Sequence, residues 1–115
     1  MKMDQRQKFK KHQRIVKNLE NRLKESGKYA YVVSNLLINP DKQYTYGEVD
    51  LYALREVNSR DYLLFFEIKG EQFGRRKAIS QLIKDENYFK NTADRVYKFF
   101  VYGVGKKDYK IERIK

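Results

Sequence analysis

Two carboxylates and a lysine interrupt an apolar stretch of the chain. They are Asp50, Glu67 and Lys69. Glu67 and Lys69 are two positions apart, so their side chains share one face of a strand, and strand pairing can bring Asp50 beside them. Burying two acids and a lysine in an apolar sheet costs free energy unless another group compensates the charges. Because a divalent metal ion held by the acids would do this, the stretch predicts a metal site.

Two β-strands joined by a polar turn are expected to position these three residues. Aromatic and β-branched residues predict the first strand at residues 46–54 and the second at residues 60–69. Residues 56–60 supply the turn between them. A further apolar strand is expected at residues 29–38, before this hairpin.

The remaining pattern predicts two helices and two more strands. An amphipathic helix is expected over residues 4–26 and a second helix over about residues 75–91. A strand at residues 96–104 is expected inside a mixed sheet, and a strand at residues 109–114 has the alternating charges of an edge. We therefore expect one α/β domain over residues 1–115. The buried face of the second helix is expected to hold Ala78, Ile79, Leu82, Ile83 and Phe89.

The spacing of Asp50 and the tripeptide Glu67-Ile68-Lys69 resembles the signature of the PD-(D/E)xK nuclease superfamily. The leading Pro-Asp pair is Val49-Asp50 here, so the proline is absent. Size and layout are most similar to the small Holliday-junction resolvases and their relatives, and the likeness covers nearly the whole chain. It implies a restriction-endonuclease-like core in the order helix, three strands, helix and strand, with a mixed central sheet and an extra C-terminal edge strand.

The resemblance also implies metal-dependent hydrolysis of phosphodiester bonds in DNA. Asp50 and Glu67 would hold Mg²⁺, for which Mn²⁺ can substitute, and the carbonyl of Ile68 would add an oxygen ligand. The metal would neutralise the phosphate and lower the pKa of a bound water, while Lys69 would orient that water and offset charge in the transition state. Gln81 matches a Gln or Lys that many members carry near the catalytic lysine. A homodimer is implied too, because a resolvase cuts two strands symmetrically.

Three other residues bear on the expected metal site. Small resolvases commonly donate a glutamate from the first helix, but that register falls on His12 here, and the nearest acid, Glu20, lies off the apolar stripe. His12 either replaces the glutamate or packs in the core. Glu48, two positions before Asp50 on the same strand face, is either a further ligand or an edge charge that faces solvent.

The chain is strongly basic, with a net charge of +11 at pH 7. Residues 1–28 hold ten Lys and Arg against three acids. This balance favours a polyanionic partner, nucleic acid ahead of an anionic membrane surface, although the lysines could serve only to keep the protein soluble. DNA-binding residues are expected on the first helix and after Gly70. They are Lys10, Lys11, Arg14, Arg75, Arg76 and Lys77.

Composition excludes several other classes of protein. The absence of cysteine excludes disulfides, thiolate metal sites and a cysteine nucleophile. A single histidine excludes a histidine-rich metal site. No apolar run is long enough to span a bilayer and no signal-peptide pattern is present, so we expect a cytoplasmic protein with no membrane partner.

Three alternatives to a junction-specific nuclease stay open at this point. The same catalytic core would serve a nuclease that acts on single-stranded, nicked or specific duplex DNA. A non-catalytic nucleic-acid-binding module would use the basic residues and exposed tyrosines without a metal. A structural ion pair between Glu67 and Lys69 is also possible, although it leaves Asp50 unexplained.

Overall fold

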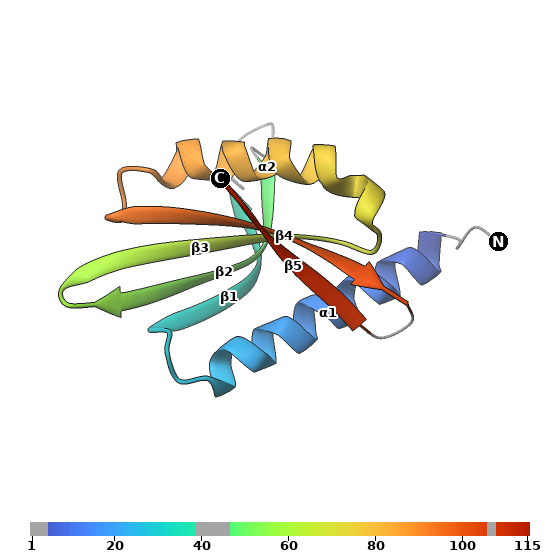
Figure 1. Cartoon of the computed structure of the whole chain (residues 1–115), viewed down its shortest axis with the longest axis horizontal. Helices are drawn as coiled ribbons and strands as arrows, with labels where there is room; N and C mark the ends of the chain where they lie inside the picture. The colour runs from blue at the N-terminus through green and yellow to red at the C-terminus, as the bar shows by residue number, and fades with distance from the viewer. Residues whose placement is uncertain (1–4, 39–46, 106–107) are drawn as a thin grey trace.

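Segments rich in β-branched and aromatic residues form five strands, which pair into one mixed sheet (Figure 1). The computed structural model describes residues 5–38, 47–105 and 108–115. The expected first residues of the helix at 4–26 and of the strand at 46–54 lie outside these ranges. The strands are β1 (Tyr31–Ile38), β2 (Gly47–Val57), β3 (Arg60–Lys69), β4 (Arg95–Val104) and β5 (Asp108–Ile114).

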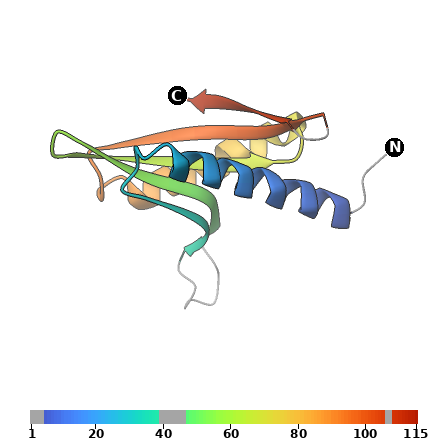
Figure 2. The ribbon, with the colours of Figure 1, turned by 90° about the horizontal axis from the view of Figure 1, so that it is seen from below.

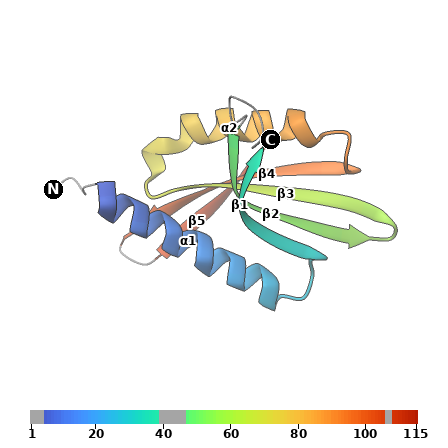
Figure 3. The same cartoon turned by 180° about the vertical axis from the view of Figure 1, so that it is seen from behind.

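Two α-helices lie on opposite sides of the sheet (Figures 1 and 3). Helix α1 (Gln5–Glu25) precedes β1, and α2 (Arg75–Phe89) connects β3 to β4 after the short 3₁₀-helix η1 (Gln72–Gly74). Within the described ranges, neither helix is long and apolar enough to cross a membrane. The α/β class and the predicted order of elements are confirmed.

The strand order is β1-β2-β3-β4-β5. β3 and β4 pair in parallel, and the other neighbours pair antiparallel. Parallel pairing requires a crossover, which α2 supplies. β4 therefore lies inside the sheet and β5 at its edge, as the sequence predicts.

The β2–β3 hairpin closes with a two-residue turn. Asn58 and Ser59 both have positive φ, 53° and 65°, between the paired residues Val57 and Arg60. A turn with two positive φ values matches the twist of the flanking strands. The predicted end of the first strand at residue 54 is therefore wrong by three residues, because the tight turn lets pairing continue to Val57.

Each helix covers its own apolar cluster on the sheet. On the α1 side the buried residues are Ile15, Val16, Leu19, Leu51, Phe66, Ile68 and Val101. On the α2 side they are Val49, Leu63, Phe65 and Leu82. The alternation of side chains along β3 sends even positions to α1 and odd positions to α2. Glu67 and Lys69 therefore lie on the face that α2 covers.

A bend in β1 and β2 breaks this alternation at Asp50. Val49 packs on the α2 side while Leu51 packs on the α1 side, although residues two apart normally share a face. The bend lies between the Ser34–Leu51 and Leu36–Val49 pairs, where Asn35 has φ 57°. Figure 2 shows both strands curving away from the rest of the sheet there. The bend redirects Asp50 toward the end of β3.

The buried face of α2 differs from the prediction at two positions. Ile83, which was predicted to be buried, is 45% exposed, whereas Asp85, which was not in the predicted face, is buried. Ala78 and Leu82 are buried as expected. The helix therefore buries a carboxylate that was not expected on this face.

Candidate metal and catalytic site

The three chemistry-bearing residues meet where β3 ends. The Asp50 Oδ2 atom accepts a hydrogen bond from the backbone N–H of Ile68 at 2.8 Å. Burial raises the pKa of the Glu67 carboxyl group, and the negative charge of Asp50 lies close enough to raise this pKa further. The Lys69 Nζ atom lies 3.7 Å from the Oε1 atom of Glu67. The structure thus brings together Asp50, Glu67 and Lys69 from two neighbouring strands.

Burial controls the protonation of this pair of acids. Asp50 and Glu67 are 7% and 6% exposed, whereas the side chain of Lys69 is 36% exposed. Burial, followed by the negative charge of Asp50, raises the pKa of Glu67 well above its usual range, and Lys69 offsets this only in part. Without a cation the pair therefore holds a proton near neutral pH.

A third buried acid, Asp85, adjoins the pair and was not among the predicted site residues. Its Oδ1 atom accepts a hydrogen bond from Gln81 Nε2 at 3.0 Å. Burial raises the pKa of Asp85 to about 6, and its charge also raises the pKa of Glu67. The available signal was helical spacing, because positions 78, 82 and 85 lie on one helix face. Gln81, a predicted catalytic residue, is thus engaged with an acid beside the site.

His12 and the two candidate acids Glu20 and Glu48 lie in different surroundings. The Nε2 atom of His12 is 3.4 Å from Asp50 Oδ2, so α1 brings the imidazole to the site. Glu20 forms an ion pair with Lys24 at 3.8 Å, one turn further along the same helix. Glu48 is exposed on β2. A metal-binding role for His12 or Glu48 stays a prediction.

The donor atoms fit a hard cation that keeps part of its water shell. The buried Oε2 atom of Glu67 and the buried Oδ2 atom of Asp85 have no hydrogen-bond partner. Within the part of the chain that the structure describes, no group of three or more His, Cys, Asp or Glu residues could hold a metal ion. Mg²⁺ is usually bound through one or two carboxylates together with waters and substrate phosphates. The Asp50–Glu67 pair meets that smaller requirement, with the carbonyl of Ile68 as the further predicted ligand.

Gly74 makes room for the side chain of Lys69. A Cβ atom at Gly74 would lie 2.8 Å from Lys69 Cγ and 3.2 Å from its Cβ. The φ of Gly74 is −76°, which any residue can adopt, so the requirement for glycine is steric. Gly70, at the other end of the same loop, would bring an added Cβ only to 3.8 Å from Lys11 Cδ.

Close packing also brings the basic side of α1 to this end of the sheet. A Cβ atom at Gly103 would lie 2.5 Å from the carbonyl oxygen of Gly70 and 2.8 Å from Lys11 Cε. The aliphatic part of Lys11 therefore packs where β3 and β4 end. Lys10 and Arg14, near it on α1, are exposed.

The basic residues at the start of α2 are only partly available to a ligand. Arg75 forms two hydrogen bonds to Glu112, both 2.9 Å, and this partner raises the pKa of Arg75. Arg76 and Lys77 are exposed. All three belong to the first turn of α2 rather than to the preceding loop, since residues 72–74 form η1. Arg75 thus presents a neutralised charge where a free one was predicted.

Comparisons of the chain with protein-family models, with curated proteins and with solved structures found no match.

Proposed function

We propose that this protein is a metal-dependent DNA endonuclease with a restriction-endonuclease-like core of the PD-(D/E)xK type. One observation carries the proposal: Asp50, Glu67 and Lys69, which lie on two strands, meet at one end of the sheet. A structural ion pair would account for Glu67 and Lys69. It would not account for a second buried acid whose charge opposes ionisation of the first.

The acid pair would hold Mg²⁺, with Mn²⁺ as a substitute. A bound divalent ion supplies Lewis-acid chemistry, neutralising phosphate charge and lowering the pKa of water. Asp50 and Glu67 would release the proton that the pair holds as the cation binds, because a positive charge favours both ionised forms. The N–H of Ile68 holds Asp50 in place throughout.

Lys69 would act on the water and the scissile phosphate. Its side chain is partly exposed, so its ammonium group can reach a phosphate at the mouth of the site. There it would orient the attacking water and stabilise charge that develops in the transition state. Gln81 and Asp85 would act as positioning residues, because their hydrogen bond fixes a carboxylate next to Glu67.

The proposed substrate is branched or structured DNA, bound by a homodimer in the cytoplasm. Basic residues from both helices would contact phosphates around the site, while Arg75 is already paired with Glu112. These contacts position the backbone and carry no sequence information. The contacting residues would be Lys10, Lys11, Arg14, Arg76 and Lys77.

A cleavage panel tests the proposal. Labelled four-way junction, flap, single strand and linear duplex are incubated with the protein in Mg²⁺, in Mn²⁺ and in EDTA. We expect cleavage of the junction in either metal and none in EDTA. A preference for single-stranded, flap or duplex substrates would support the proposed catalytic site but replace branched DNA as the substrate. Binding without cleavage of any substrate in either metal would contradict nuclease activity.

A second candidate function is a non-catalytic nucleic-acid-binding module. It is favoured by the finding that the described residues contain no group of three His, Cys, Asp or Glu able to hold a metal. Such a module would bind DNA equally well in Mg²⁺ and in EDTA.

A further inference from the structure

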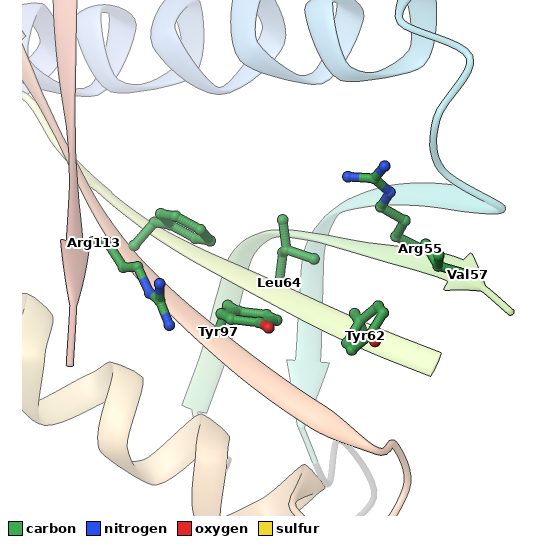
Figure 4. A pocket seen from close by; sticks show the side chains of 7 residues that line it. Arg55, Val57, Tyr62, Leu64, Tyr97 and Arg113 are labelled. Atoms are coloured by element: carbon green, nitrogen blue, oxygen red, sulfur yellow. The ribbon is translucent and has the colours of Figure 1, made fainter. Parts of the chain in front are cut away.

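A hollow lies on the face of the sheet that α1 covers only in part (Figure 4). Its volume is about 550 Å³. Tyr62 in this hollow precedes Glu67 by five positions, roughly 17 Å along β3, and the two side chains point to opposite faces. The hollow is therefore separate from the acid pair. It is lined by Arg55, Val57, Tyr62, Leu64, Tyr97, Phe99 and Arg113.

Aromatic rings form the floor of this hollow. The ring centres of Tyr62 and Tyr97 are 6.1 Å apart, and Phe99 stacks against Phe66 with centres 4.9 Å apart. Tyr62, Tyr97 and Phe99 are only partly buried. The floor thus offers aromatic surface to a flat ligand.

Two arginines flank the aromatic floor. Arg113 lies over the ring of Tyr97, with its guanidinium carbon 4.8 Å from the ring centre. Arg55 is exposed on β2, at the other side of the hollow (Figure 4). β2 and β5 are three strand spacings apart, about 14 Å across the sheet, and the pairing register displaces Arg113 from Arg55 by four residues, about 13 Å, along the strands. Among the residues that the structure describes, no Asp or Glu lines the hollow. Arginine is always protonated, so both positive charges are permanent.

We propose that this hollow binds unpaired bases of single-stranded DNA. The bases stack on Tyr62 and Tyr97, and the phosphates on either side pair with Arg55 and with Arg113, which moves off the Tyr97 ring that it covers in the free protein. Aromatic stacking combined with cationic groups along the backbone is the chemistry of single-strand binding sites. Aromatic residues on an open sheet face stack about two or three bases in a common nucleic-acid-binding module. A purely apolar partner would leave the two arginines without a counter-charge.

The test measures binding of a fluorescein-labelled oligo(dT) by anisotropy in EDTA, where no metal-dependent cleavage takes place. Replacing Tyr97 or Tyr62 with Ala should weaken binding by about 5-fold to 150-fold, because each stacked base is worth about 1–3 kcal/mol. Tyr97→Phe keeps the ring and should bind nearly as well as the original protein. Circular dichroism and thermal unfolding check that each variant is folded.

Arginine variants supply a test that does not depend on the core. The slope of the logarithm of the binding constant against the logarithm of salt concentration measures the number of phosphate contacts. Arg55→Gln should make this slope less steep by about 0.7, the value for one phosphate contact on a single strand. Arg60→Gln is the matched control, since Arg60 is also exposed on the same hairpin but does not line the hollow. It should leave the salt dependence unchanged.

Several results would overturn the proposal. Affinities of the Tyr97→Ala and Arg55→Gln variants equal to that of the original protein would do so, as would equal sensitivity of duplex binding to these changes. Tighter binding of oligo(U) than of oligo(dT) would assign the hollow to RNA instead. If Tyr97→Ala only converts a dimer to a monomer in sedimentation, a second copy of the chain covers the hollow. Because the assay contains no metal, its failure would leave the proposed cleavage site untouched.

Discussion

The backbone N–H of Ile68 donates a 2.8 Å hydrogen bond to the carboxylate of Asp50. The residue that separates Glu67 from Lys69 is therefore tied directly to the acid on the neighbouring strand. The bend of β2 makes this contact possible, because it redirects Asp50 where regular side-chain alternation ends. One hydrogen bond thus fixes the relative positions of all three residues in the proposed catalytic set.

Gly74→Ala should disturb the position of Lys69 without unfolding the protein. The added methyl group would meet the Cβ and Cγ atoms of Lys69, which cannot move as freely as the ammonium end. We expect at least a ten-fold loss of kcat in single-turnover cleavage, with DNA affinity nearly unchanged. Gly70→Ala is the matched control, since its methyl group meets only Lys11 Cδ at 3.8 Å. Equal activity of the two variants would show that Gly74 does not position Lys69.

Lys69→Ala should abolish turnover while metal binding persists. In our account the lysine acts on water and phosphate, and the acids hold the ion. Calorimetric titration with Mn²⁺ measures metal affinity, and single-turnover cleavage measures the chemical step. Lys98→Ala is the matched control, because Lys98 also pairs with a glutamate, Glu86, at 3.0 Å but lies outside the acid cluster. Loss of metal affinity in Lys69→Ala alone would make this lysine a structural support for the acids.

Glu67→Gln should stabilise the metal-free protein more at pH 8 than at pH 5. The pKa of Glu67 is raised in the folded protein above its unfolded value of about 4.3, so folding retains a proton that the unfolded chain releases. The stability that this retained proton gives the folded protein is fully present below the unfolded pKa of Glu67. It is lost as the pH rises toward the folded pKa. Glutamine avoids that loss. We expect a gain of at least about 4 °C in Tm at pH 8 in EDTA, equivalent to about 1 kcal/mol, and little gain at pH 5.

The control for this pH dependence is Glu56→Gln, because Glu56 is exposed on β2. Its effect on Tm should be small at both pH 5 and pH 8. A constant difference between Glu67→Gln and the original protein from pH 5 to pH 8 would contradict a raised pKa at Glu67. Asp85, whose pKa is raised to about 6, should add a smaller loss of stability between about pH 4 and pH 6.

Replacing Arg76 and Lys77 with Ala should make duplex binding less sensitive to salt. The slope of the logarithm of the binding constant against the logarithm of salt concentration should become less steep by roughly 1.8, or about 0.9 for each phosphate that is no longer neutralised. Arg75 is left in place because Glu112 already neutralises it. Lys28 and Lys90 make a matched control pair, since they are exposed just after the C-terminal ends of α1 and α2. If both double variants lose the same salt dependence, a generally basic surface binds DNA and no defined track exists.

Much of the fold follows from local sequence patterns. Apolar periodicity predicts both helices and all five strands, and the spacing of Asp50, Glu67 and Lys69 predicts that they meet. The hairpin boundary was wrong because Asn58 and Ser59 adopt left-handed conformations, which lengthens β2 to Val57. Such conformations are rare for residues other than glycine and are weakly marked in a sequence.

The rest of the site depends on contacts between distant segments. Asp85 interrupts an apolar helix face, and only the packing of α2 on β3 shows that it is buried near Glu67. The ion pair between Arg75 and Glu112 joins residues 37 positions apart and depends on how β5 pairs with β4. Tertiary packing decides such contacts, so spacing along the chain could not predict them.

The most direct test of the central claim is single-turnover cleavage of a four-way junction by Asp50→Asn and Glu67→Gln in Mg²⁺. Each change removes one negative charge at nearly constant shape, so the fold and DNA binding should persist. Asp94→Asn is the matched control, since Asp94 also accepts a backbone hydrogen bond, from Asp61 at 2.6 Å. Our account predicts loss of at least about 10³-fold in cleavage rate for both site variants, about 4 kcal/mol of transition-state stabilisation, and full activity for Asp94→Asn. Mg²⁺-dependent cleavage by either site variant at a rate close to that of the original protein would contradict it.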